Sequence, residues 1–288
     1  MPIATLDDVL LPALRKGYAV AGMVVLGWED AGAFVEAAQA EGAPIILQAG
    51  PGCRAHTPLP VLAAMFNTLA RDATVPVVAH LDHSISAEEC RRAVDLGFTS
   101  VMFDGSRLPL DENIAQTAAI VRMAREAGVS VEGELGFVGY DEGEASRGTD
   151  PDEARRFAEE TGVSALAVSI GNVHLQRTEQ AVIDLARLRA IEAATRLPLV
   201  LHGGSGIGET ARRELATTTR VCKFNVGTEV RMAFGRALRR VLADDPQVFD
   251  RLQIMRGTQP AMLEAARRVI RSVASEGRGS PRSTHKPA

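Results

Sequence analysis

Eight short apolar runs recur along this chain, and segments with apolar residues at helical spacing separate them. The runs cover residues 19–25, 44–48, 75–82, 98–104, 129–135, 164–170, 197–202 and 221–226. Helical spacing is clearest over residues 30–40, 87–96, 112–127 and 151–161. Glycines such as Gly42 and Gly162 stand where a helix would end before the next strand. Strands that alternate with helices predict a parallel sheet with crossover connections.

Two α/β folds accommodate eight such units. An open, doubly wound sheet would bind its ligand at a topological switch point, yet no glycine-rich dinucleotide motif follows the first run. A closed (β/α)8 barrel, or TIM barrel, typically needs about 250 residues and builds its site from the carboxyl ends of many strands. In this chain of 288 residues, side chains capable of chemistry follow the third to the eighth run. We therefore predict the barrel.

Beyond the eighth run the sequence predicts extra C-terminal helices. Two helical patterns cover residues 229–243 and 259–275, joined by a segment that contains Arg251. We predict one domain, the barrel with these helices, over residues 1–275. Residues 276–288 are polar and rich in glycine and proline, with nothing to bury, so we predict a disordered tail.

Composition excludes several classes of partner. A net charge of −4 gives no broad basic field, which argues against a nucleic acid or an anionic membrane as partner. No apolar stretch approaches the ~18 residues needed to span a bilayer. The three cysteines are widely spaced and the first residues lack the pattern of a signal peptide, so we expect a reduced, cytoplasmic protein.

Three histidines follow strand-like runs and form a candidate metal site. They are His83, His174 and His202. Parallel strands bring their carboxyl ends to one rim, and three neutral imidazoles with one open position are typical of a catalytic zinc ion. The alternative is three histidines with ordinary structural hydrogen bonds. We predict one catalytic Zn²⁺, with a second or alternative metal position nearby.

Carboxylates accompany these histidines. Asp82 precedes the first of them, and we predict that it moves a proton to or from an oxygen near the metal; the alternative is that it only orients His83. Asp104 and Glu134 end the fourth and fifth runs. Both are candidates for the second metal position, and the alternative is that they neutralise Lys223 or arginines in the barrel mouth.

An acidic, glycine-bearing segment follows Glu134 and has the composition of a mobile lid. A lid carboxylate can arrive with the substrate and act as a base. The candidates are Asp141, Glu142 and Glu144. Most acidic residues in loops are only solvated, which is the alternative for each of them.

Glycine-rich turns follow the seventh and eighth runs. They read His-Gly-Gly-Ser-Gly over residues 202–206 and Asn-Val-Gly-Thr over residues 225–228. Glycine lets backbone amides approach a ligand, Ser205 and Thr228 add hydroxyl groups, and barrel enzymes commonly bind phosphate with the loops in these positions. The alternative is that the glycines serve tight turning alone.

In combination and in this order, these motifs resemble the class II, zinc-dependent ketose-bisphosphate aldolases, the group that contains fructose- and tagatose-bisphosphate aldolases. The resemblance runs from about residue 10 to about residue 272. The stretches that carry it are Gly-Tyr-Ala-Val at 17–20, His-Leu-Asp-His-Ser at 80–84, Gly-Phe-Thr-Ser-Val-Met-Phe-Asp-Gly-Ser at 97–106, Val-Glu-Gly-Glu-Leu-Gly at 131–136, Thr-Asp-Pro-Asp-Glu-Ala at 149–154, Leu-Val-Leu-His-Gly-Gly-Ser-Gly at 199–206 and Lys-Phe-Asn-Val-Gly-Thr-Glu at 223–229.

The resemblance implies a role for each part of the site. It makes the three histidines the zinc ligands, with Asp104 and Glu134 as alternative ligands. Asp82 would exchange the proton of the hydroxyl group at the cleaved bond. Glu142, with Asp141 close behind, would exchange the proton on the carbon of dihydroxyacetone phosphate.

The resemblance also implies where the substrate binds. The residues that fall where the family holds phosphate and ketone are Gly203, Gly204, Ser205, Asn225, Gly227 and Thr228. Arg251 would contact phosphate across a subunit boundary, and we expect a homodimer or a homotetramer.

Several positions depart from the family pattern. Met23 and Val24 stand where phenylalanine and asparagine are usual, Gly50 replaces a substrate-binding serine, and Leu175 replaces the glycine after the second zinc histidine. A leucine would crowd the anion site, and the lost serine removes a hydroxyl donor. We therefore expect retained metal chemistry with altered substrate recognition.

The function predicted is the reversible retro-aldol cleavage of a ketose phosphate or bisphosphate, or of a related ketose. The products would be dihydroxyacetone phosphate, or a fragment of that type, and an aldehyde, formed through a metal-stabilised enediolate. Two alternatives stay open from sequence. One is a zinc-dependent barrel hydrolase, and the other is a non-catalytic, aldolase-like binding subunit.

Overall fold

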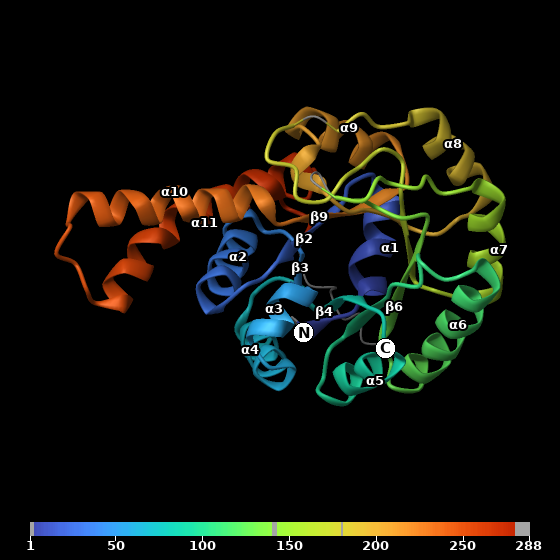
Figure 1. The fold of residues 1–288 in the computed structure, drawn as a ribbon, viewed down its shortest axis with the longest axis horizontal. Helices are drawn as coiled ribbons and strands as arrows, with labels where there is room; N and C mark the ends of the chain where they lie inside the picture. Colours follow the sequence, from blue (N-terminus) through green and yellow to red (C-terminus); the bar gives the residue numbers. More distant parts are fainter. Residues whose placement is uncertain (1–2, 140–142, 180, 280–288) are drawn as a thin grey trace, which may run out of the picture.

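Eight parallel strands close into a barrel in the computed structural model, which describes residues 3–139, 143–179 and 181–279 (Figure 1). The strands are β2 (Val20–Val24), β3 (Ile45–Ala49), β4 (Val77–Ser84), β5 (Ser100–Phe103), β6 (Ser130–Leu135), β7 (Ala165–Val168), β8 (Leu199–Leu201) and β9 (Val221–Val226). Each strand pairs with the next, and β9 pairs with β2. The predicted (β/α)8 barrel is confirmed.

Helices surround the barrel and return the chain to its amino end. They are α2 (Trp28–Glu41), α3 (Pro51–His56), α4 (Leu59–Asp72), α5 (Ala87–Asp95), α6 (Leu110–Glu126), α7 (Pro151–Thr161), α8 (Leu185–Ala194) and α9 (Glu209–Thr218), with a short 3₁₀ turn, η1 (Gly204–Gly206). Gly42 and Gly162 end α2 and α7 in the left-handed conformation, as their positions predicted.

The first residues form two elements that the sequence analysis did not include. β1 (Ile3–Ala4) pairs with Val77 and Val78, at the start of β4. Thr5, the residue before α1 (Leu6–Lys16), caps that helix, and its side chain accepts a hydrogen bond from the amide of Asp8. The buried face of α1 packs against inward side chains of the barrel strands. This end of the barrel is therefore closed, and the site opens at the other.

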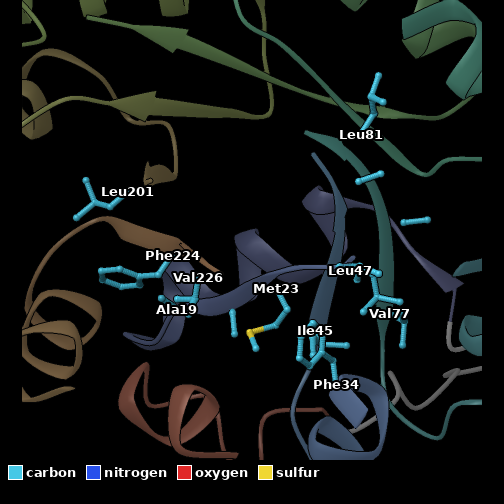
Figure 2. Close-up of a cluster of buried hydrophobic side chains, with 14 of the residues drawn as sticks. Ala19, Met23, Phe34, Ile45, Leu47, Val77, Leu81, Leu201, Phe224 and Val226 are labelled. Carbon is cyan, nitrogen blue, oxygen red and sulfur yellow. The ribbon is translucent and has the colours of Figure 1, made fainter. Parts of the chain in front are cut away.

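Alternation along each strand divides the core into two clusters. In β3, Ile45 and Leu47 face the surrounding helices, whereas Ile46 points into the barrel and packs with α1. Figure 2 shows part of the outer cluster, in which Phe34 of α2 lies near Ile45. Burying each side chain of this size stabilises the fold by about 1.5–3 kcal/mol.

Inside the barrel the side chains become polar toward the open end. Two residues beyond Ile46 and Val78 come Gln48 and His80, which lie opposite each other in register and are fully buried. The next inward residue on β4 is Asp82. Every second residue of a strand points into the barrel, and in these strands the inward residues near the open end are polar.

α10 (Thr228–Asp244) and α11 (Arg251–Ser272) form a hairpin that extends away from the barrel, and α11 returns to pack along α2 (Figure 1). The predicted start of the last helix, residue 259, is wrong. α11 begins at Arg251, where the side chain of Asp250 accepts a hydrogen bond from the amide of Gln253. Pro260 lies inside the helix and does not begin it.

The chain after α11 remains in contact with α2. The amides of Gly277 and Gly279 donate to the carbonyl oxygens of Glu41 and Gly42. These residues belong to the segment predicted as a disordered tail, and residues 280–288 of that segment lie outside the described part of the chain. None of the described helices is both long and apolar enough to span a membrane.

Candidate metal and substrate site

An irregularity in β4 lets two consecutive residues face one cavity. Leu81 pairs with Val101 and Ser84 pairs with Phe103, so three steps along β4 match two along β5. Between them, His83 adopts a φ of 50°. Successive side chains of a regular strand point to opposite faces, but the extra residue of a bulge redirects one of them. Asp82 and His83 consequently both line the cavity at the barrel mouth.

The three histidines predicted as metal ligands lie together. The ring centroids of His83, His174 and His202 are 4.5–5.6 Å apart. Nitrogen atoms from all three lie within 4.8 Å of one another. Within the described residues, Nε2 of His83 and Nδ1 of His202 are buried without a hydrogen-bond partner. A buried polar atom left unpaired costs about 1–3 kcal/mol, so this arrangement fits a bound divalent ion.

Carboxylates orient two of these rings. Nε2 of His202 lies 3.1 Å from Oε1 of Glu132, and Nδ1 of His83 lies 2.8 Å from Oδ2 of Asp104. A carboxylate only accepts hydrogen bonds, so the partnered nitrogen carries the proton. The remaining nitrogen of each ring is then free to ligate a metal, which is the usual role of such carboxylates.

A buried polar network lies beneath the metal site, and the sequence did not predict it. Nζ of Lys223 lies 2.6 Å from Oε2 of Glu132, and both side chains are fully buried. Nδ1 of His80 lies 2.8 Å from Oγ of Ser100. Glu132 therefore neutralises the charge of Lys223. The alternative role suggested for Asp104 and Glu134, neutralising Lys223, is not what the structure shows. The available signal was the alternation of Glu132 with Glu134, which places both inside the barrel.

Asp82 is held by two amide side chains. Nε2 of Gln48 donates to its Oδ1 at 2.8 Å, and Nδ2 of Asn225 donates to the same atom at 3.3 Å. Burial by itself raises the pKa of Asp82, but the charge of His83 and Lys223 outweighs it and holds the pKa below the ordinary value. The side chain is thus ionised at neutral pH, in the form that can accept a proton.

Asp104 and Glu134 form a second group with His83. Ligand atoms of the three lie within 4.8 Å of one another, and Oε2 of Glu134 is buried without a hydrogen-bond partner in the described chain. Burial, reinforced by the charge of Asp104, raises the pKa of Glu134 well above its usual range. This arrangement fits a second or alternative metal position.

The cavity at the barrel mouth has a volume of about 320 Å³. The predicted site residues that line it are Asp82, His83, Asp104, His174, Gly203, Ser205, Asn225, Gly227 and Thr228. Three other predicted residues, His202, Glu134 and Gly204, are buried and do not line it. The lining also includes side chains that the sequence analysis did not single out, among them Cys53, Arg107, Phe137 and Arg231.

One side of the cavity has the features of an anion site. Gly203 adopts a φ of 65°, and a β-carbon there would lie 2.0 Å from the carbonyl oxygen of Val173. Gly227 precedes Thr228, the first residue of the long helix α10. The amides at a helix N-terminus point toward a bound anion. Arg231, in the first turn of α10, also lines this side and adds a positive charge.

Three of the four positions at which the sequence analysis found departures, Val24, Gly50 and Leu175, line this cavity, whereas Met23 is buried in the core. Leu175 adopts a φ of 60°, is 51% exposed and lines the cavity. Gly50 has an ordinary φ of −75°, and a β-carbon there would meet Oδ2 of Asp82 at 3.6 Å. A side chain at residue 50 is therefore sterically acceptable, whereas the one at residue 175 sits in a conformation that favours glycine.

Only one of the three lid candidates, Glu144, lies within the described residues. Asp141 and Glu142 lie outside the described residues. Glu144 is exposed, and its Oε2 lies 2.7 Å from Nη2 of Arg107, whose guanidinium group stacks over the ring of Phe137. Glu144 thus contacts a residue that lines the cavity. Arg251 lies at the far end of the α10–α11 hairpin and does not line this cavity.

Comparison with known proteins gives consistent relatives over almost the whole chain. Residues 4–278 match the family described as fructose-bisphosphate aldolase class-II. A fructose-bisphosphate aldolase of Staphylococcus aureus (strain Mu50 / ATCC 700699) is 37% identical over 285 residues, covering 96% of this chain and 99% of the relative. One of Geobacillus stearothermophilus is 36% identical over 287 residues, covering 97% and 100%.

Solved structures agree with this assignment. The crystal structure of the YdjI aldolase from Escherichia coli K12 superposes with a TM-score of 0.85 at 32% identity, covering 96% of this chain and 99% of that one. A putative fructose-1,6-biphosphate aldolase from Coccidioides immitis gives a TM-score of 0.82 at 26% identity, covering 94% and 96%.

Proposed function

This chain belongs to the class II fructose-bisphosphate aldolase family, and from that membership we propose that it cleaves a ketose phosphate to dihydroxyacetone phosphate, or a fragment of that type, and an aldehyde. The reaction is a reversible retro-aldol cleavage. The observation that carries the proposal is the set of unpaired, buried histidine nitrogens beside the carboxylate of Asp82. Family membership favours this function over the hydrolase and the non-catalytic binding subunit.

The family implies a divalent metal, and we propose that it is Zn²⁺. His83, His174 and His202 would hold it, because three neutral imidazoles suit this ion. When bound, the ion supplies a Lewis acid that polarises the substrate carbonyl. Asp104 and Glu134 would provide a second or alternative position through His83.

Two different carboxylates are proposed for the two proton transfers of the reaction. In cleavage, Asp82 takes the proton from the hydroxyl group at the bond that breaks, and in synthesis it returns that proton. Gln48 and Asn225 keep its Oδ1 fixed while this happens. Glu142, or Asp141 beside it, is the proposed group that exchanges the proton on the substrate carbon.

The substrate's phosphate would bind where the turns after β8 and β9 meet. Backbone amides at Gly203 and Gly204, the hydroxyl groups of Ser205 and Thr228 and the start of α10 supply the donors. Asn225 and Gly227 complete this side. Gly50 and Leu175, where we expect departures from the family, also line the cavity. We therefore expect a substrate other than fructose 1,6-bisphosphate to be cleaved best.

A homodimer or a homotetramer would cover the projecting hairpin. Phe249 is 93% exposed and Leu252 is 60% exposed, and both lie where α10 and α11 are joined. Exposed apolar groups of this kind mark contact surfaces. Arg251, between them, would reach a substrate phosphate in the neighbouring subunit. We propose a cytoplasmic location for this assembly.

The test is a screen of ketose bisphosphates, ketose monophosphates and free ketoses for aldehyde release by zinc-loaded protein. We expect release that a chelator abolishes, and a loss of about 10²–10⁴-fold in kcat on Asp82→Asn with metal content unchanged. The exposed Asp95→Asn is the matched control. Full activity of the Asp82 variant would refute the proton-transfer role, and release of inorganic phosphate without aldehyde would favour a hydrolase.

A further inference from the structure

We propose that Arg54 and Glu89 are positioning residues that hold the bulge of β4 in the shape the reaction needs. The inference rests on the proposed roles of Asp82 and His83. Both side chains must face the cavity, and a regular strand would turn one of them away. Some feature outside the strand must therefore fix the irregular backbone.

Arg54 contacts the backbone of both residues in the bulge. Its Nη1 donates to the carbonyl oxygen of Asp82 at 2.6 Å, and its Nη2 donates to that of His83 at 3.2 Å. Nη1 also donates to the carbonyl oxygen of Ala49, at the end of β3. One guanidinium group thus ties together the ends of two neighbouring strands.

Glu89 fixes the other edge of the same guanidinium group. Nε and Nη2 of Arg54 donate to its two carboxylate oxygens at 2.9 and 3.1 Å. Oγ of Ser84, the last residue of β4, donates to Oε2 of Glu89 at 2.7 Å. Glu89 lies in the first turn of α5, so the clamp joins α3, α5 and the bulge of β4.

The planar fork of arginine is what this arrangement requires. All three nitrogens of the group are used, and the Arg54 side chain is only 9% exposed. Lysine carries the same charge on a single ammonium group and cannot reproduce a bidentate pair together with three carbonyl contacts. The clamp also supports His83 at its left-handed φ, which non-glycine residues rarely adopt.

The experiment compares Arg54→Lys, Glu89→Gln and Arg54→Ala, with the exposed Arg91→Lys on α5 as the matched control. For each zinc-loaded protein we would measure kcat and KM for the best substrate of the screen. For each Co²⁺-loaded protein we would record the visible spectrum, which reports the ligand geometry. Far-UV circular dichroism would establish that each variant is folded.

We expect Arg54→Lys to lower kcat about 10–100-fold while KM changes less than about threefold, because the metal and the proton-transfer group lose their mutual geometry. The Co²⁺ spectrum should change in parallel. Glu89→Gln should show a smaller loss, Arg54→Ala a larger one, and Arg91→Lys none. Should Arg54→Ala fail to fold, the first two variants still decide the matter.

A folded Arg54→Lys protein with the wild-type kcat and the wild-type Co²⁺ spectrum would overturn the inference. Asp82→Asn, assayed alongside, separates this failure from a failure of the proposed function. If Asp82→Asn is inactive and Arg54→Lys is fully active, only the positioning role is wrong. If Asp82→Asn is itself fully active, the catalytic assignment fails and the inference fails with it.

Discussion

Glu132 links the metal site to the charge buried beneath it. It accepts a hydrogen bond from His202 and forms an ion pair with Lys223, and all three side chains are buried. Removing one partner of a buried pair leaves the other charge uncompensated, which costs about 3–5 kcal/mol. A residue that contacts no substrate is thereby essential to the shape of the site.

We predict that Glu132→Gln lowers the free energy of unfolding of the metal-free protein by about 3–5 kcal/mol, as measured by urea denaturation. The double variant Glu132→Gln, Lys223→Met should recover part of that loss, because the isolated charge is gone. A single variant as stable as the wild type would contradict the prediction.

The protonation of His83 makes metal affinity depend on pH. Burial lowers the pKa of this imidazole, but the facing carboxylates of Asp82, Asp104 and Glu134 outweigh it and raise the pKa to about 10. Burial lowers the pKa of His174 to about 4, so that ring is already neutral at pH 7. Below its pKa, His83 holds a proton that a metal ion must displace.

Zinc affinity should therefore rise with pH, by about tenfold per unit from about pH 6 to about pH 9. Competition with a chromophoric chelator measures the affinity, and proton release on metal addition in weak buffer is the companion measurement. The same titration on Asp104→Asn should show a weaker dependence, since one of the groups that holds the proton is gone. An affinity independent of pH would exclude this coupling.

At the scale of elements, the loop after β7 carries Leu175 where the family resemblance leads us to expect glycine. Leu175 lines the anion side of the cavity and adopts a φ of 60°. Its side chain is half exposed, so little burial is lost when it is removed. Backbone strain and bulk at this position can be separated, because glycine relieves both and alanine relieves only the bulk.

We predict that Leu175→Gly and Leu175→Ala both lower KM for fructose 1,6-bisphosphate, because both open the anion side. Only the glycine variant should keep or raise the wild-type melting temperature, since alanine still occupies the left-handed conformation. Steady-state kinetics and thermal unfolding provide the two measurements. An unchanged KM in both variants would show that Leu175 does not affect which substrate binds.

The regular elements were predictable because burial imposes a period on them. β9 covers the predicted run 221–226, and the other barrel strands begin and end within about two to four residues of the predicted bounds. The start of α11 was missed because Gly257 and Pro260 are poor helix formers, and packing of the hairpin overrides that preference.

The site was predictable only in part. Its histidines and carboxylates belong to the strand pattern, whereas Arg54 acts through contacts with backbone atoms 28 and 29 residues away. Every residue has a carbonyl oxygen, so the sequence does not indicate which of them a side chain will contact. Neither the bulge nor the role of Arg54 could therefore be predicted from the sequence.

At the scale of the whole molecule, the projecting hairpin is the surface best suited to self-association. We predict that Phe249→Asp shifts the assembly toward monomers, because a charge replaces an apolar side chain that a partner would cover. Sedimentation velocity measures the shift. Val61→Asp, at an apolar side chain 54% exposed on α4, is the matched control. An unchanged distribution would place the interface elsewhere.

The burial of Lys223 has a consequence for the chemistry open to this enzyme. The chain contains three lysines, Lys16, Lys223 and Lys286, and the one inside the barrel is fully buried against Glu132. A carbonyl carbon cannot reach that amine, so an imine with the substrate has no place to form. Borohydride should therefore trap no adduct of the substrate at Lys223.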